Sequence, residues 1–361
     1  MKRREFARNL LGLPMAAMLS SEAAFAAANE LELPPGGSIT DVPGLKVGHH
    51  TLKERPTGCT VLICESGATA GVDVRGSAPG TRETDLLSPI NSVQQVQAIL
   101  LSGGSAYGLA AATGVVKWLE EHNLGYKIGK GVVPIVPAAI LMDLGVGNFK
   151  IRPGEEDGYK ACVAATTGPV AEGNVGAGAG ATIGKMFGPK FSMKSGLGTA
   201  SVKIGDTGIV VGALVAVNAV GDVVNPQTGK VVAGARSEDG KGYRDSMDAM
   251  MKGYRVVVQN AANTTIGVVA TNAPFTKTQM TKIAQMAHDG YARAINPVHT
   301  MGDGDTIFSM STGTATVKAD VTAIGAIAAV VMSRAIVRAA MQATSIPELG
   351  LPAYRDYPSK A

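Results

Sequence analysis

Hydroxyl and carboxylate side chains in the last third of the chain could together cleave an amide bond. Thr264 opens an apolar run that ends at Ala273, and Asp303 and Asp305 flank a glycine further along. A threonine hydroxyl is a poor nucleophile at neutral pH and needs an adjacent base, yet no histidine is evident for that role. If the chain were cut between Asn263 and Thr264, the freed α-amine, which titrates near pH ~8, would be that base. The sequence therefore predicts a self-cleaving hydrolase with an N-terminal threonine nucleophile.

Apolar runs and helical periodicity predict the elements that would hold these side chains. Residues 209–218 form an apolar run suited to a strand buried on both faces, with Asn218 at its end. Residues 276–295 show helical periodicity. Residues 319–343 are nearly all apolar and long enough to cross a bilayer, but two arginines interrupt them. We therefore expect this last helix to be buried in the core.

The first half of the chain indicates further strands and a helix, so the fold class is mixed α/β. Residues 59–64 and 70–75 read as two short strands with a turn between them, and residues 96–101 as another. A helix should follow and end at His122. Residues 236–254 are polar, charged and rich in methionine, and read as a flexible connector that leads to the predicted cut.

Composition is typical of a folded enzyme rather than a disordered or nucleic-acid-binding chain. Of the 361 residues 45% are hydrophobic and 17% charged, and the net charge is only +4. No run of Lys and Arg offers a track for phosphates. Cys59 and Cys64 should point to opposite faces of a strand, so they are not expected to form a disulfide with each other. The five histidines are scattered, and the sequence implies neither a metal nor a cofactor.

Residues 1–28 have the layout of an export signal. Met1-Lys2-Arg3-Arg4-Glu5-Phe6 supplies positive charge, a modest apolar stretch follows, and small residues surround Ala26. The paired arginines before Phe6 favour the twin-arginine route and thus a periplasmic location. The alternative, a short membrane anchor, conflicts with an apolar run that is well short of the ~20 residues needed to span a bilayer.

Several local patterns allow a structural reading beside a functional one. The glycines between Gly176 and Lys185 resemble a phosphate loop, but the P-loop spacing fails. They more simply let the backbone approach something closely, with Lys185 adding a charge there, although Lys185 alone could be a surface lysine. Asn218 could be a satisfied structural amide or a donor to an oxyanion. Asp303 and Asp305 alone could form a solvated turn.

Longer motifs, taken in order, resemble one family. The self-processing aminopeptidases, which include L-aminopeptidase/D-amidase-esterases, β-peptidyl aminopeptidases and nylon-oligomer hydrolases, are similar over essentially the whole mature chain. The stretches that carry the resemblance are residues 37–49, 73–83, 102–109 and 174–178. The resemblance implies a four-layer α/β/β/α sandwich like that of other N-terminal-nucleophile hydrolases. It also implies an α chain (29–263) and a β chain (264–361) that stay associated in one catalytic domain, with tetramers common.

The resemblance also implies roles for particular residues. An Asn263–Thr264 junction is cut in the nylon-hydrolase branch, where two aspartates follow at the spacing of Asp303 and Asp305, whereas peptidase relatives more often use serine as nucleophile. The remaining positions match the active-site lysine, the active-site amide and a pocket aromatic of the family; they are Lys185, Asn218 and Tyr107.

The expected activity is release of N-terminal residues from small peptides, amides or esters. Alternatives by related chemistry are an amidase acting on ω-amino-acid oligomers and an acyltransferase of the ornithine-acetyltransferase type. A periplasmic binding protein without enzymatic activity, in which Thr264 is merely a strand residue, is a further alternative. Neither nucleic acid nor, for the mature form, a membrane is an expected partner.

Overall fold

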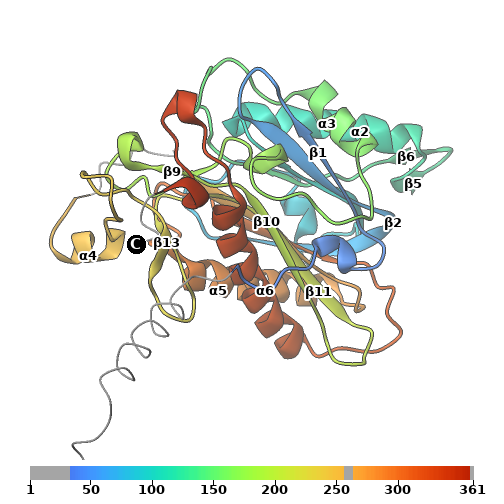
Figure 1. The fold of residues 1–361 in the computed structure, drawn as a ribbon. Helices are drawn as coiled ribbons and strands as arrows, with labels where there is room; N and C mark the ends of the chain where they lie inside the picture. Colours follow the sequence, from blue (N-terminus) through green and yellow to red (C-terminus); the bar gives the residue numbers. More distant parts are fainter. Residues whose placement is uncertain (1–32, 256–262, 358–361) are drawn as a thin grey trace, which may run out of the picture. The chain divides into compact units, whose positions relative to one another are not determined.

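One long strand, β2 (Gly58–Val74), connects the two sheets of this computed structural model, which describes residues 33–255 and 263–357 (Figure 1). Its first half pairs with β1 (Lys46–Thr51) and β4 (Val96–Ser102), and its second half pairs with β16 (Thr306–Ser311). The predicted export signal lies outside the described residues. The remainder, Pro34–Ala361, forms one compact unit.

The prediction of two short strands separated by a turn at this place was wrong. The chain does not reverse between Ile63 and Ala68, because a register shift in the pairing with β4 absorbs the irregular residues. Gly67 lies there with φ +81°, a conformation that glycine adopts without steric cost. The irregularity lets one strand serve two sheets.

The strands follow a mixed order. Along the hydrogen-bonded path the sequence is β10-β11-β14-β16-β2-β4-β7-β3, and β1 pairs with β2 beside it. The β14–β16 and β4–β7 pairs are parallel, and the other pairs on this path are antiparallel. The strands not yet bounded are β3 (Thr81–Arg82), β7 (Ala138–Ile140), β10 (Leu197–Lys203), β11 (Val210–Asn218) and β14 (Thr264–Thr271).

Alternation of side chains along the strands produces four layers. Val61 and Ile63 of β2 pack with residues of α2 (Ala111–Glu121) and α3 (Glu155–Val163). Leu62, between them in sequence, faces the other way and belongs to the core between the two sheets, with Leu214, Ile266 and Phe308. Helices α5 (Lys277–Ala294) and α6 (Val321–Gln342) pack on the outer face of the second sheet (Figure 1). The predicted α/β/β/α sandwich is confirmed.

Helices α5 and α6 begin at polar caps and bury apolar faces. Thr276 forms a capping box with Gln279 at the start of α5, and the Asp320 carboxylate accepts from Ala323 N at the start of α6. Helix α6 is long and apolar enough to cross a membrane, but 72% of its most apolar window is buried inside the protein. It packs against α5, β10 and β11, as expected for a core helix.

The region predicted as a flexible connector contains a short helix, α4 (Ser246–Met251), so that prediction was wrong in part. Asp245 starts the helix, since its carboxylate accepts from Met247 N and Asp248 N at 2.9 Å each. The remaining short strands are β5 (Tyr126–Ile128), β6 (Gly131–Val133), β8 (Thr182–Ile183), β9 (Met193–Lys194), β12 (Asp222–Val224), β13 (Val231–Ala233) and β15 (Ile295–Asn296).

Close packing of α6 on β10 gives a test of the layer arrangement. A Cβ added at Gly198 would lie 2.1 Å from Ala335 O and 2.5 Å from Ala339 N, whereas a Cβ at Gly131 would meet no described atom within 4 Å. We expect Gly198→Ala to lower the free energy of unfolding by about 1–3 kcal/mol through overpacking. The control Gly131→Ala should change it little. Equal denaturant midpoints for the two variants would contradict this packing.

Candidate active site

Thr264 is the first residue of β14 and lies at the end of the core between the sheets. Its side chain is on the same face of the strand as Ile266, which belongs to that core. In the neighbouring strand β11, Asn218 is the direct partner of Thr264, and Asn218 shares its face with the core residue Ala216. Thr264 is only 3% exposed. The strand register therefore brings a hydroxyl and an amide together in a nearly dry position.

The peptide bond between Asn263 and Thr264 is held by contacts on both sides. The carbonyl oxygen of Asn263 accepts from the backbone N–H of Gly304 at 3.0 Å, and it also accepts a short hydrogen bond from the Thr264 hydroxyl. On the other side, Thr265 N donates to Asp305 Oδ1 at 2.7 Å. The predicted cleavage site is therefore enclosed, with its carbonyl already polarised by a backbone donor.

Gly304 lies against the Thr264 side chain. A Cβ at this position would lie 2.9 Å from Thr264 Oγ1 and 2.7 Å from Ala78 O. The absence of a side chain thus lets the backbone between Asp303 and Asp305 approach the hydroxyl closely.

The side chain of Asn263 is fully buried, and neither of its amide atoms has a hydrogen-bond partner among the described residues. A buried polar group without a partner costs roughly 1–3 kcal/mol. The intact chain therefore holds the residue before Thr264 in an unfavourable environment.

The two aspartates lie beside each other but have unequal surroundings. Asp305 Oδ2 accepts from the backbone N–H of His299 at 3.1 Å and contacts its ring Nδ1 at 2.9 Å. Asp303 Oδ2 accepts from Thr300 N at 2.8 Å, while its Oδ1 is buried without a partner in the described part of the chain. Burial and then the charge of Asp305 raise the pKa of Asp303 to about 6.

Lys185 and Asn218 form a second pair on the other side of Thr264. Lys185 Nζ donates to Asn218 Oδ1 at 2.7 Å and to the backbone oxygen of Asn218 at 3.0 Å. The lysine is partly buried rather than on the surface. Burial lowers its pKa to about 7, although the carboxylates of Asp303, Asp143 and Asp305 act in the opposite direction. Its ammonium is thus poised to titrate near neutral pH.

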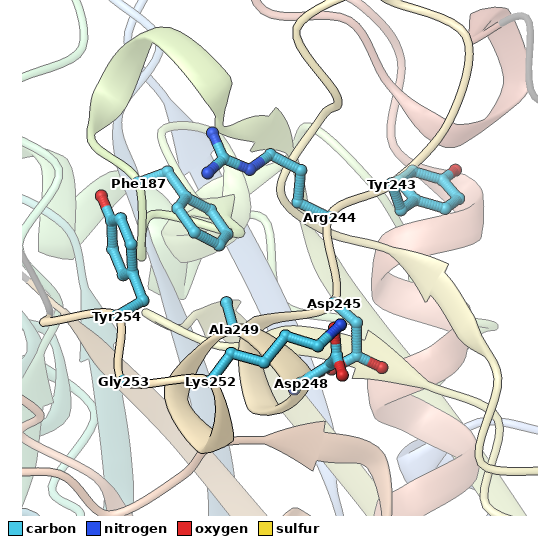
Figure 2. Close-up of a pocket in the computed structure, with 9 residues that line it drawn as sticks. All are labelled: Phe187, Tyr243, Arg244, Asp245, Asp248, Ala249, Lys252, Gly253 and Tyr254. Carbon is cyan, nitrogen blue, oxygen red and sulfur yellow. Dashed lines mark hydrogen bonds and ion pairs between the residues drawn. The ribbon is translucent and has the colours of Figure 1, made fainter.

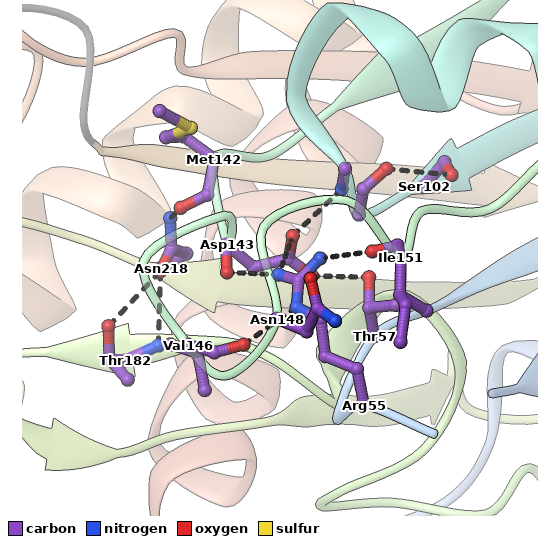
Figure 3. A network of polar contacts seen from close by, with 12 residues as sticks. Arg55, Thr57, Ser102, Met142, Asp143, Val146, Asn148, Ile151, Thr182 and Asn218 are labelled. Atoms are coloured by element: carbon purple, nitrogen blue, oxygen red, sulfur yellow. Dashed lines mark hydrogen bonds and ion pairs between the residues drawn. The ribbon is translucent and has the colours of Figure 1, made fainter. Parts of the chain in front are cut away.

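A buried ion pair, Arg55–Asp143, lies next to the residue that binds the Asn218 amide (Figure 3). Asn218 Nδ2 donates to Met142 O at 2.9 Å. The adjacent carboxylate of Asp143 binds the fully buried Arg55 guanidinium at 2.6 Å and accepts from Thr57 and Gly104 N. Other N–H groups of the guanidinium donate to backbone oxygens of the same loop, those of Val146 and Ile151. The network fixes the loop that orients the amide.

The backbone around Gly76 clamps the loop that carries the two aspartates. Arg75 N and Gly76 N both donate to the backbone oxygen of Asp305, at 3.0 and 3.2 Å, and Ala78 N donates to that of Asp303 at 2.8 Å. A Cβ at Gly76 would lie only 2.2 Å from Asp305 N. The close backbone contact therefore leaves no room for a side chain at Gly76.

Tyr107 is less closely connected to Thr264 than the other predicted site residues are. It lies on the 3-10 turn Ser105–Ala110 and is 56% exposed, with the Arg152 guanidinium 3.8 Å from its ring centroid. Within the described part of the chain it has no hydrogen bond to the cluster around Thr264. Gly104, directly before this turn, donates its backbone N–H to Asp143 Oδ1 at 2.8 Å.

A pocket of about 700 Å³ opens elsewhere, beside α4. Figure 2 shows the rings of Phe187 and Tyr254 beside each other in it, tilted by 55°, and the Arg244 guanidinium lies 3.6 Å from the Phe187 ring centroid. Its described lining includes none of the predicted catalytic residues. The candidate site is therefore defined by the contacts around Thr264 and not by this pocket.

The sequence did not point to His299, Gly304 as a backbone donor, or the Arg55–Asp143 pair. His299 is six residues before Asp305, a spacing that has no meaning until the loop folds back. In the sequence, Gly304 is only the residue between two aspartates, and its role as a backbone donor depends on the folded loop. A buried arginine far upstream gives no local signal at all, because its partners are mainly backbone oxygens.

The chain is similar in sequence to known proteins. A protein of Mycobacterium tuberculosis named as an uncharacterized aminopeptidase is 43% identical over 345 residues, covering 88% of this chain and 97% of that protein. The 6-aminohexanoate-oligomer endohydrolase of a Kocuria species is 32% identical over 316 residues, covering 83% of this chain and 85% of that protein.

The fold has a solved counterpart. The L-aminopeptidase D-Ala-esterase/amidase of Ochrobactrum anthropi, described as a variant of the Ntn hydrolase fold, superposes with a TM-score of 0.63 at 20% identity, covering 87% of this chain and 88% of that one. The family model of peptidase family S58 matches residues 37–350. With nearly the whole described chain matched by that model, the protein is a member of peptidase family S58.

Proposed function

We propose that this S58 hydrolase is a self-cleaving aminopeptidase/amidase whose nucleophile is Thr264, freed as a new N-terminus. The observation that carries the proposal is the enclosed Asn263–Thr264 bond. Its carbonyl oxygen accepts both the Gly304 N–H, at 3.0 Å, and the hydroxyl of the very residue that would attack it. An ordinary buried strand start has no need for this arrangement.

Self-cleavage would proceed by an acyl shift. The Thr264 oxygen attacks the carbonyl carbon of Asn263, and the Gly304 N–H stabilises the negative oxygen that forms. The C–N bond then breaks, the nitrogen of Thr264 takes up the proton lost by the hydroxyl, and an ester joins the two residues. Water hydrolyses this ester, leaving a carboxylate on Asn263 and a free amine and hydroxyl on Thr264.

In the processed enzyme the same hydroxyl would act on substrate. The α-amine takes the hydroxyl proton while the oxygen attacks the substrate carbonyl, and Asp303 and Asp305 hold the resulting ammonium. An amide NH₂ has two donors, and Asn218 Nδ2 gives one to Met142 O. Its second donor stabilises the oxyanion, a contribution that is typically about 3 kcal/mol for one donor.

The substrate class follows from the acidic surroundings. Two buried carboxylates next to the nucleophile suit a substrate that carries a free ammonium group near the scissile amide. The 43% identical relative named as an aminopeptidase supports the same assignment. We therefore propose release of N-terminal residues from small peptides, amides or esters.

The 32% identity to a 6-aminohexanoate-oligomer endohydrolase favours a second candidate, an amidase acting on ω-amino-acid oligomers. Both activities would use Thr264, so the assay and not the site separates them. We expect the purified protein to cleave alanine p-nitroanilide faster, in kcat/KM, than 6-aminohexanoate oligomers. The reverse order would transfer the assignment to the oligomer amidase. Transfer of the acyl group to an added amine in preference to water would indicate an acyltransferase.

The expected organisation is part of the same proposal. Residues 29–263 would form the α chain and 264–361 the β chain. The chains would stay together, because β14 pairs with β11, and β16 with β2, across the cut. Export through the twin-arginine route to the periplasm and assembly into a tetramer are also proposed.

Replacement of the nucleophile tests self-cleavage directly. Thr264→Ala should remain one uncut, inactive chain, because no hydroxyl can attack Asn263, whereas the control Thr264→Ser should still be cut. The measurement is intact mass spectrometry together with amidase activity. Two fragments from the alanine variant, or full activity in an uncut chain, would refute the proposal.

The raised pKa of Asp303 predicts how stability depends on pH. The carboxyl titrates near its ordinary value of 3.8 when unfolded and at about 6 in the folded chain, so the folded state binds the proton more tightly. Its contribution to stability is therefore present below pH 3.8 and is lost as pH rises to about 6.

In the uncut Thr264→Ala background, Asp303→Asn should thus gain stability relative to its parent between these two pH values, with no further gain above them. Thermal melting at a series of pH values measures this difference. Asp206→Asn, on an exposed turn, controls for the loss of a carboxylate. A constant difference between Asp303→Asn and its parent across the window would show that the Asp303 carboxyl is not perturbed.

A further inference from the structure

His299 faces the acid pair from outside the set of predicted catalytic residues. Its ring Nδ1 lies 2.9 Å from Asp305 Oδ2, and its backbone N–H donates to the same oxygen at 3.1 Å. With the Thr265 N–H on Oδ1 at 2.7 Å, three nitrogen atoms surround the Asp305 carboxylate. Among the described residues, Asp303 accepts hydrogen bonds from one residue, Thr300, through its backbone N–H at 2.8 Å and its side chain. Donors to a carboxylate favour its charged form, so the surroundings distinguish the two acids.

The orientation of the imidazole is over-determined. His299 has φ +55°, a left-handed conformation that is uncommon for residues with a side chain. Its ring is stacked against Tyr291 at 6.0 Å between centroids and meets His288 edge-on at 4.8 Å. Packing by α5 on these sides leaves Nδ1 directed at the carboxylate.

The other ring nitrogen favours one tautomer of His299. Its Nε2 is buried and has no partner among the described residues. A proton on Nε2 would leave a buried N–H without a described partner, whereas a proton on Nδ1 places that N–H on Asp305. The tautomer with its proton on Nδ1 is therefore the one that fits these contacts.

We infer that His299 is the positioning residue of the acid pair: its Nδ1–H fixes Asp305 as the charged carboxylate against Thr265 N, and Asp303 takes up the shared proton. This inference rests on the proposed function, in which Asp303 and Asp305 together hold the α-ammonium of Thr264, and it assigns the negative charge of the pair to Asp305. His299 itself neither touches the substrate nor accepts the proton of the hydroxyl. That proton passes from the Thr264 oxygen to the Thr264 nitrogen as the new C–O bond forms.

Six other charged or titratable groups surround His299 and Asp305. They lie on the same loop, on α5, at the end of β2 and the residue after it, and on the segment after β8. These groups are Asp303, His288, Tyr291, Asp73, Arg75 and Lys185. Burial lowers the pKa of His288 to about 4, so this neighbour is neutral at the pH of an assay and does not take over the role of His299.

Two substitutions at His299 that are compatible with its positive φ distinguish the effect of the side-chain N–H donor from the effect of ring packing. Glycine and asparagine both adopt positive φ readily. His299→Gly removes the imidazole, whereas His299→Asn retains an N–H donor on a short side chain. Each variant is first checked by mass spectrometry for self-cleavage, and kcat and KM are then measured against pH.

For His299→Gly we expect kcat at neutral pH to fall about tenfold or more. We also expect the acid limb of the plot of kcat against pH to move up by about one pH unit. The reason is that a hydrogen bond to a charged group changes an equilibrium constant by roughly one to two powers of ten. The direction follows because a less stabilised Asp305 carboxylate protonates at higher pH. KM should change little, and His299→Asn should keep its limb near that of the wild type.

Two results would overturn the inference: a wild-type profile in His299→Gly, or the same displaced limb in both variants. If His299→Gly does not fold, His299→Asn is compared with His299→Asp, which matches it in shape but cannot donate once ionised. Equal profiles for these two would also overturn it. Failure of the proposed function would give a different result. The wild type would be active although uncut, or Thr264→Ala would be active, independently of the results for the His299 variants.

Discussion

The register of β14 between β11 and β16 is the constraint on which the whole site depends. Antiparallel pairing places Asn218 opposite Thr264, and the parallel approach of the other neighbour brings Gly304 N to Asn263 O and Asp305 to Thr265 N. A slip of one residue would turn the Thr264 side chain away from the core between the sheets and separate it from every one of these partners. The side chains that face the core between the sheets, such as Leu214, Ile266 and Phe308, hold the three strands in this register.

The buried polar groups at this end of the core form a connected hydrogen-bond network. The Asn218 side chain binds Lys185 and the Met142 carbonyl. The residue after Met142 is Asp143, which forms the buried ion pair with Arg55. Removal of one partner from a buried ion pair is far more damaging than its presence is stabilising. The Arg55 network is thus better understood as specifying the loop conformation than as a source of net stability.

The parts of the structure that follow from local pattern were predictable. The strand at 209–218 is found at Val210–Asn218, the helix at 276–295 at Lys277–Ala294, and the helix at 319–343 at Val321–Gln342. The opposite orientation of Cys59 and Cys64 also follows from strand alternation, and they lie in different cores. Each of these predictions needs only the periodicity of a single element.

What sequence could not give depends on contacts between distant segments. The irregularity at Gly67 reads as a turn, because a glycine in the left-handed region serves a bulge and a turn equally well. Helix α4 was missed because a six-residue helix capped by Asp245 has too few positions to show a period. His299 gives no signal in the sequence, because its partner is not the threonine hydroxyl but a carboxylate that contacts Thr265 N.

Burial of Thr264 at 3% exposure has a consequence for timing. The groups that contact this bond come from the chain itself, and their geometry does not exist before the strands are assembled. Under the proposed self-cleavage, maturation would be a first-order event whose rate is independent of protein concentration, with completed folding as its trigger. An enzyme carried across a membrane in its folded form would then complete this step irrespective of the compartment, since every group that it needs travels with the chain.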